Sequence, residues 1–188
     1  MAQVTVMPET FELIAFDAGE IARIAGEVAD LVGLDPEVRV DVVVDEAMLI
    51  ARSVTTLAGG NVRIEATGGA FESLRQPRTF DPERCRTVLG QMLLRAHDRL
   101  DPKFGSPPED GELSVDLEAA WATYVEGRLD RLGVVRGRPI RRVYQFRVRH
   151  GFNDAVDAAF DRLWNGPDLS FDDIARLSSE AAGATVPA

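Results

Sequence analysis

Apolar residues recur at spacings of three and four in five stretches of the chain, and this periodicity predicts five helices. The predicted helices cover residues 17–33, 81–100, 114–133, 153–165 and 170–180. Each of them starts at a residue whose side chain can accept hydrogen bonds from free backbone amides. These capping residues are Asp17, Asp81, Ser114, Asn153 and Ser170. A capped start followed by an apolar stripe therefore locates each helix.

Alternation of apolar and polar residues predicts strands between the first two helices. Residues 38–46 place four valines on one face and mostly charged side chains on the other. Residues 62–66 alternate in the same way, and residues 48–56 are expected to be extended. The sequence Leu-Ala-Gly-Gly-Asn at 57–61 is a turn signal. Residues 38–66 are therefore predicted to form an antiparallel hairpin or meander.

Two further strands are predicted outside this block. One lies within residues 1–16, and the other covers residues 140–149, which are rich in valine and aromatic side chains. The resulting order of elements favours an α+β fold, in which a small antiparallel sheet of three to five strands packs with about five helices. We expect one domain over residues 1–188, which could divide at the loop-forming segment 101–111. Residues 181–188 are expected to be a disordered tail.

Composition narrows the classes of protein that the chain could belong to. A formal net charge of −10 disfavours binding to nucleic acid or to anionic lipid. No apolar run has the length of a membrane span, and no basic residue precedes a hydrophobic run near the N-terminus. A single cysteine excludes an internal disulfide. We therefore expect a cytoplasmic protein with neither a membrane nor a nucleic acid as its partner.

Motifs of common enzyme classes are missing from the sequence. There is no P-loop, no glycine-rich dinucleotide fingerprint, no serine-nucleophile elbow and no H-E-x-x-H zinc motif. Cys85 is in phase with the apolar stripe of its predicted helix, so we expect an inert, buried thiol. His97 and His150 are too few for a histidine-rich metal site. Asp41 and Asp45 stand about 13 Å apart along a strand, too far to share one ion, so no cofactor or metal is predicted.

One stretch, residues 131–153, is rich in arginine and has no acidic residue. Its basic residues are Arg131, Arg136, Arg138, Arg141, Arg142, Arg147, Arg149 and His150. The general excess of arginine, with Lys103 as the only lysine, is typical of coding by a GC-rich genome, but this local cluster is not explained in that way. Arginines beside aromatic side chains bind carboxylates and phosphates, or stack on bases. The candidate binding residues are Arg138, Arg141, Arg142, Tyr144, Arg147, Arg149 and His150.

The arginine-rich stretch has two interpretations. In the first, its arginines pair with carboxylates of the same chain, such as Asp41 and Asp45 on a neighbouring strand. In the second, they contact an acidic protein, another anionic partner or a second copy of the chain, which predicts a non-catalytic binding or accessory protein. The alternative function is an enzyme with a site of arginine, carboxylate and one histidine, either His97 or His150, in a deep pocket.

The order of the predicted elements offers one resemblance to a known fold. A short helix and a strand meander followed by a long helix resembles the layout of small zincin-like metallopeptidases, whose long helix carries H-E-x-x-H. The corresponding helix here contains Gly90-Gln91-Met92-Leu93-Leu94 and lacks that motif. The resemblance therefore implies a non-catalytic relative of that fold.

Overall fold

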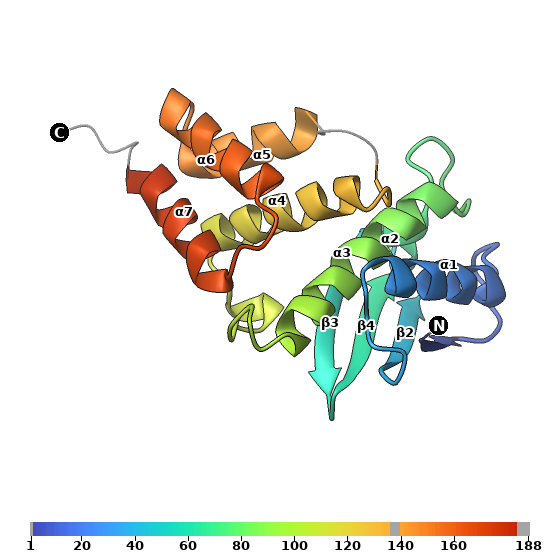
Figure 1. Cartoon of the computed structure of the whole chain (residues 1–188). Coiled ribbons are helices and arrows are strands. Elements are labelled where there is room, and N and C mark those ends of the chain that lie inside the picture. Colours follow the sequence, from blue (N-terminus) through green and yellow to red (C-terminus); the bar gives the residue numbers. More distant parts are fainter. Residues whose placement is uncertain (1, 136–139, 184–188) are drawn as a thin grey trace. The chain divides into compact units, whose positions relative to one another are not determined.

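The computed structural model describes residues 2–135 and 140–183, and the chain in it divides into two compact units (Figure 1). Unit 1 is Met1–Leu100 and unit 2 is Asp101–Ala188, so the division falls at the start of the 101–111 segment. The described residues form a four-stranded sheet and seven helices. The predicted α+β class is therefore confirmed, and the number of strands lies within the predicted range.

Unit 1 contains the sheet, together with helices that pack on one of its faces (Figure 1). Its elements are β1 (Gln3–Met7), α1 (Ala18–Leu31), β2 (Arg39–Asp45), β3 (Ser53–Ala58), β4 (Asn61–Thr67), α2 (Gly68–Phe71) and α3 (Pro82–Leu100). The spatial order of the strands is β1-β2-β4-β3. Helices α1 and α3 pack against each other, and both contact the sheet.

The alternation of residues in β2 determines which of its faces the helices cover. Val40, Val42 and Val44 are buried, whereas Asp41 and Val43 between them are partly exposed. Burying one such side chain contributes about 1.5–3 kcal/mol, so a shift of β2 by one residue would lose all three contributions. α1 begins where it is predicted to begin, because the Asp17 carboxylate accepts a hydrogen bond from the amide of Gly19 (2.8 Å).

The predicted antiparallel arrangement is wrong for most of the sheet, which is mixed. β2 is parallel to both β1 and β4, and only β3 runs antiparallel, beside β4. The turn predicted at 57–61 does connect the antiparallel pair β3 and β4. Residues 46–52, however, form a loop that carries the chain to the edge position of β3, so β2 pairs with β4. The segment 48–56 is consequently a strand only from Ser53 onward.

Helices are the regular elements of unit 2 among its described residues, and loops connect them. Its elements are η1, a turn of 3-10 helix (Asp110–Glu112), α4 (Val115–Arg131), α5 (Ile140–His150), α6 (Asp154–Asn165) and α7 (Phe171–Gly183). Helix α4 contacts α5, α6 and α7 (Figure 1). Its Trp121 packs against the rings of Phe104 and Phe171. Residues 181–183, assigned to a tail by the sequence, belong to α7, and residues 184–188 lie outside the described residues.

The predicted strand over 140–149 is wrong, because these residues form helix α5. Val143, Phe146 and His150 recur at helical spacing, and the last two are buried among the helices of unit 2. The stretch also satisfies an alternating pattern, because Tyr144, Phe146 and Val148 would share one face of a strand, and this is why the sequence favours a strand. Gly151 ends the helix with a φ of 111°, and its amide donates to a carbonyl of the last turn (2.7 Å).

We expect Gly127→Ala to destabilise unit 2. A Cβ at Gly127 would lie 2.2 Å from the carbonyl oxygen of Trp164, so the backbones of α4 and α6 would have to separate. Overpacking of this kind costs about 1–3 kcal/mol, which exceeds the gain of roughly 1 kcal/mol in helix propensity. Urea denaturation followed by tryptophan fluorescence measures the effect, because Trp121 and Trp164 both belong to unit 2.

Gly111→Ala is the matched control for this measurement. A Cβ at Gly111 meets nothing within 4 Å, so we expect its unfolding midpoint to stay at the wild-type value. Equal midpoints for the two variants would contradict the prediction for Gly127.

Candidate binding groove

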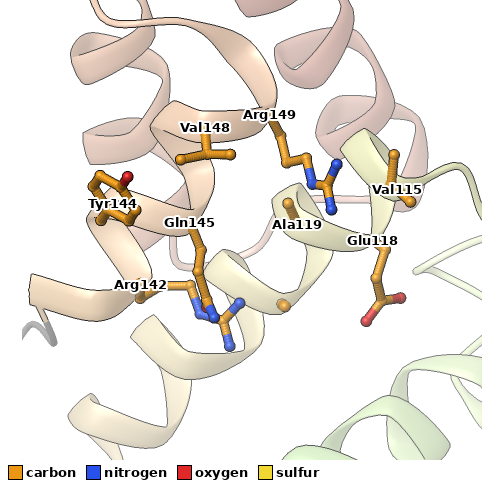
Figure 2. Close-up of a pocket in the computed structure, with 9 residues that line it drawn as sticks. Val115, Glu118, Ala119, Arg142, Tyr144, Gln145, Val148 and Arg149 are labelled. Atoms are coloured by element: carbon orange, nitrogen blue, oxygen red, sulfur yellow. The ribbon is translucent and has the colours of Figure 1, made fainter.

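The candidate site is a groove of about 340 Å³ between α4 and α5 of unit 2 (Figure 2). It is lined by Val115, Glu118, Ala119, Ala122, Arg142, Tyr144, Gln145, Val148 and Arg149. Arg142, near the start of α5, pairs with Glu126 in the second half of α4. Arg149, near the end of α5, lines the groove together with the first residues of α4. The two helices therefore run antiparallel, and the groove has an arginine toward each end.

Arg142 holds α5 against α4 and also leaves one N–H group without an acceptor. Its Nη2 donates to the carboxylate of Glu126, and its side chain is only 17% exposed. Its Nε is buried, and no described residue supplies it with a hydrogen-bond acceptor. A buried donor without an acceptor costs about 1–3 kcal/mol. A ligand that brings a carboxylate or carbonyl oxygen to this end of the groove would remove that cost.

Arg141 and Arg149 are the exposed cations of α5. Neither side chain has an ion pair or a hydrogen bond with any part of the chain that the structure describes. Figure 2 shows the guanidinium of Arg149 extending from α5 toward Val115 and Ala119 of α4. A guanidinium is charged at every physiological pH and binds carboxylates through paired hydrogen bonds. These two side chains are therefore available to an anionic group from outside the chain.

Two other arginines of the stretch are used inside unit 2. Arg147 donates twice to Asp157 of α6, from Nε (2.7 Å) and from Nη2 (2.5 Å). Arg131, at the end of α4, donates to two carbonyl oxygens at the C-terminal end of α6. The intramolecular interpretation is therefore correct for Arg147, which pairs with a carboxylate, whereas Arg131 is held by backbone carbonyls of the same unit. Arg136 and the predicted binding residue Arg138 lie outside the described residues.

The outer face of α5 carries a run of exposed apolar side chains. Ile140, Tyr144 and Val148 follow each other at four-residue intervals, and all three are more than half exposed. Phe152 is exposed too and packs edge-on against Tyr144, with ring centroids 6.0 Å apart. Helix α5 thus has a second apolar stripe besides the one that faces the core. Exposed apolar residues next to charged ones are typical of binding surfaces.

His150, a predicted binding residue, lies in the core of unit 2 and not in the groove. Its Nδ1 is 3.1 Å from the carbonyl oxygen of Phe146, and because a carbonyl only accepts, Nδ1 carries the proton. Nε2 therefore accepts a hydrogen bond from the hydroxyl of Ser178 (2.9 Å). Burial lowers the pKa of His150 below the ordinary value for histidine. The ring is thus a neutral link between α5 and α7.

The other residues considered for chemistry lie outside unit 2. Cys85 is fully buried, and burial raises the pKa of its thiol to about 12. Asp45 accepts a hydrogen bond from the amide of Ala47, and Glu46 accepts from the amides of residues 12 and 13, so both carboxylates hold backbone in place. Within the described ranges, no group of three His, Cys, Asp or Glu side chains could hold a metal ion. Over the same ranges, every helix is too short or too polar to cross a membrane.

Sequence reasoning missed the half of the groove that α4 supplies. Val115, Glu118 and Ala119 lie outside the apolar stripe that defines this helix in the sequence, and none of them belongs to a motif. The one available signal is the pair Ala119 and Ala122, because small residues three apart on a helix leave space beside a neighbouring helix.

The free energy of unfolding of unit 2 is expected to fall as the pH drops below about 6.5, the ordinary pKa of histidine. Because the pKa of His150 is lower in the folded state, the unfolded chain binds more protons in this range. The stabilising contribution of His150 is complete above the pKa that histidine has in the unfolded chain. It is lost as the pH falls through the lower pKa of His150 in the folded state. Urea denaturation at about pH 7.5 and about pH 5.5 measures the difference.

His150→Gln is expected to reduce this pH difference, because glutamine does not titrate. His97→Gln, which removes the other histidine of the chain, serves as the control and should retain it. A pH difference in His150→Gln as large as that of the wild type would contradict the assignment.

The Cys85 thiol is expected to react slowly with a thiol reagent such as DTNB while the chain is folded. With a pKa of about 12, its thiolate fraction at about pH 8 is roughly 1,000-fold below that of an ordinary cysteine. Burial of the sulfur slows the reaction further. Absorbance at the wavelength of the released thiolate measures the rate in buffer and in urea, and equal rates in the two would refute the expectation.

Compared with protein-family models, with curated proteins and with solved structures, the chain matches none. The resemblance to zincin-like peptidases accordingly rests on the order of elements in unit 1, where α3 has Gly90, Gln91 and Leu94 in place of a metal-binding motif. The function is therefore to be inferred from the geometry of the groove.

Proposed function

We propose that the protein is a non-catalytic binding module that holds a short segment of a partner protein in the groove between α4 and α5. The segment is apolar and carries at least one carboxylate. The observation that carries the proposal is the combination of an apolar lining with two arginines, of which Arg149 is unpaired and Arg142 has a buried N–H without an acceptor among the described residues.

The apolar part of the groove favours side chains such as leucine. Val115, Ala119 and Val148 line it, and covering them removes apolar surface from water at about 25 cal/mol per Å². A volume of about 340 Å³ is near the lower end of the roughly 300–1,000 Å³ range of ligand pockets. This size suits a few side chains of an extended or helical segment.

The arginines favour a segment with few carboxylates over a polyanion. A carboxylate at Arg149 can form two parallel hydrogen bonds, and a second acceptor at Arg142 would satisfy its Nε. The chain as a whole has a net charge of −10, which repels a nucleic acid over distances beyond the groove. The arginines attract an anionic group at the groove, while the rest of the acidic protein repels a polyanion. This combination supports a partner of mixed apolar and acidic character.

The enzyme hypothesis has less support from the same geometry. It calls for a histidine beside a carboxylate in a deep pocket, but His150 is buried and engaged with Ser178. The lining of the groove contains no histidine, and Glu118 is its single carboxylate. Such a set offers binding groups and lacks the acid–base pair that hydrolytic chemistry uses.

Fluorescence anisotropy with a short fluorescein-labelled peptide of leucine and glutamate tests the proposal. We expect the wild type to bind this peptide and to bind the corresponding leucine–lysine peptide much less. Arg149→Glu is expected to weaken binding by about tenfold or more, because it replaces attraction by repulsion at the groove. Val148→Asp is expected to weaken it by removing apolar contact.

Lys103→Glu is the matched control. Lys103 is exposed and outside the groove, and the substitution changes the net charge by the same amount as Arg149→Glu. Equal losses of affinity in the two variants would show a response to overall charge and would refute the groove as the binding site. Absence of binding to the glutamate peptide would refute the proposed occupant.

A further inference from the structure

Unit 1 presents a loop of exposed apolar residues between β2 and β3. This apolar loop, residues 46–52, contains Met48, Leu49 and Ile50, which are 46%, 57% and 75% exposed. Three consecutive large apolar side chains in water are unfavourable and are normally found where a surface meets a partner.

The backbone of the apolar loop is held in place at every second carbonyl. The carbonyl oxygens of residues 46, 48, 50 and 52 accept hydrogen bonds from Arg78, from Gly69 and twice from Thr67, over 2.6–3.3 Å. A side chain at position 69 is not compatible with this path, because its Cβ would lie 1.9 Å from the carbonyl oxygen of Leu49. The loop is therefore preorganised, and binding through it costs little conformational entropy.

Two exposed carboxylates accompany the apolar loop. Asp45 directly precedes it, and Glu12 lies beside it, because the amide of Glu12 donates to the Glu46 carboxylate (2.9 Å). The loop thus combines large apolar side chains with nearby carboxylates and one exposed cation, Arg52, on a rigid backbone. This is the chemistry for which the groove between α4 and α5 is suited.

We propose that the apolar loop of one copy of the chain binds in the groove of a second copy. The inference rests on the proposed function of the groove and names its partner. The argument is complementarity: the side chains of Leu49 and Ile50 match the apolar lining, and the carboxylates of Asp45 and Glu12 match the guanidinium of Arg149, which has no partner among the described residues.

Such a contact joins two different surfaces, so it is head-to-tail. Every copy offers one apolar loop and one groove, and association continues into rings or chains instead of ending at a symmetric dimer. A variant that lacks only the loop still has a groove, and a variant that lacks only the groove still has a loop. In a mixture of the two variants, the loop of the second variant can bind in the groove of the first. Each pair of copies therefore keeps one intact contact.

Light scattering after size-exclusion chromatography of the full chain tests this prediction. We expect the mass of the wild type to rise with concentration above that of a monomer. Ile50→Asp and Val148→Asp, both at exposed positions, are each expected to remain monomeric. Their equimolar mixture is expected to form a dimer with one copy of each. Leu31→Asp, at an exposed apolar position on α1, is the control and should associate like the wild type.

Three outcomes would overturn the inference: a wild type that stays monomeric at all concentrations, association that persists in both variants, or a mixture that does not associate. Circular dichroism checks that each variant is folded. The anisotropy measurement separates this inference from the function on which it rests. A monomeric wild type that still binds the leucine–glutamate peptide removes self-association and leaves the groove as a binding site, whereas loss of both removes the two proposals together.

Discussion

The ion pair between Arg142 and Glu126 sets the position of α5 on α4, and the groove depends on that position. Both side chains are mostly buried, so the cost of removing them from water offsets much of their attraction. The main effect of the pair is on register. A slide of α5 by one turn would move Arg142 by about 5.4 Å and separate its mostly buried guanidinium from the carboxylate of Glu126. Val148 and Arg149 lie farther along the same helix, so their places beside the start of α4 follow from this pair.

The arginines of α5 divide into two groups by the direction in which they leave the helix. Arg142 and Arg147 reach carboxylates on α4 and α6, and they attach α5 to the rest of unit 2. Arg141 and Arg149 remain in solvent. An acid-free helix in an acidic chain thus has both a structural role and a surface that differs in charge from its surroundings. The intramolecular interpretation of the arginine-rich stretch therefore holds for Arg142 and Arg147, and Arg141 and Arg149 are the residues to which the proposed partner contact is assigned.

Local signals predicted much of the fold, and arrangements that depend on distant residues were missed. The sequence predicted the starts of α1, α4 and α6, next to Asp17, Ser114 and Asn153. This was possible because a helix cap involves only residues a few positions away. The pairing of β2 with β4 depends on the path of a loop, which no short pattern specifies. α5 satisfies both the helical and the alternating period, and its contacts with α4, α6 and α7 decide between them. The sequence alone pointed to the residues of α5 that line the groove, because they stand together in one arginine-rich stretch. It could not show that His150 is buried, because its partner Ser178 comes from another helix.

The anchoring of residues 46–52 through backbone carbonyls separates the path of this loop from the identity of its side chains. Every residue type supplies a carbonyl oxygen, so replacing Met48 or Ile50 leaves the hydrogen bonds to Gly69 and Thr67 unchanged. An inserted or deleted residue, in contrast, would shift the later carbonyls out of phase with these donors. Substitutions at positions 48–50 therefore change the chemistry of the exposed surface without changing the path of the loop, whereas the length of the loop has to stay constant.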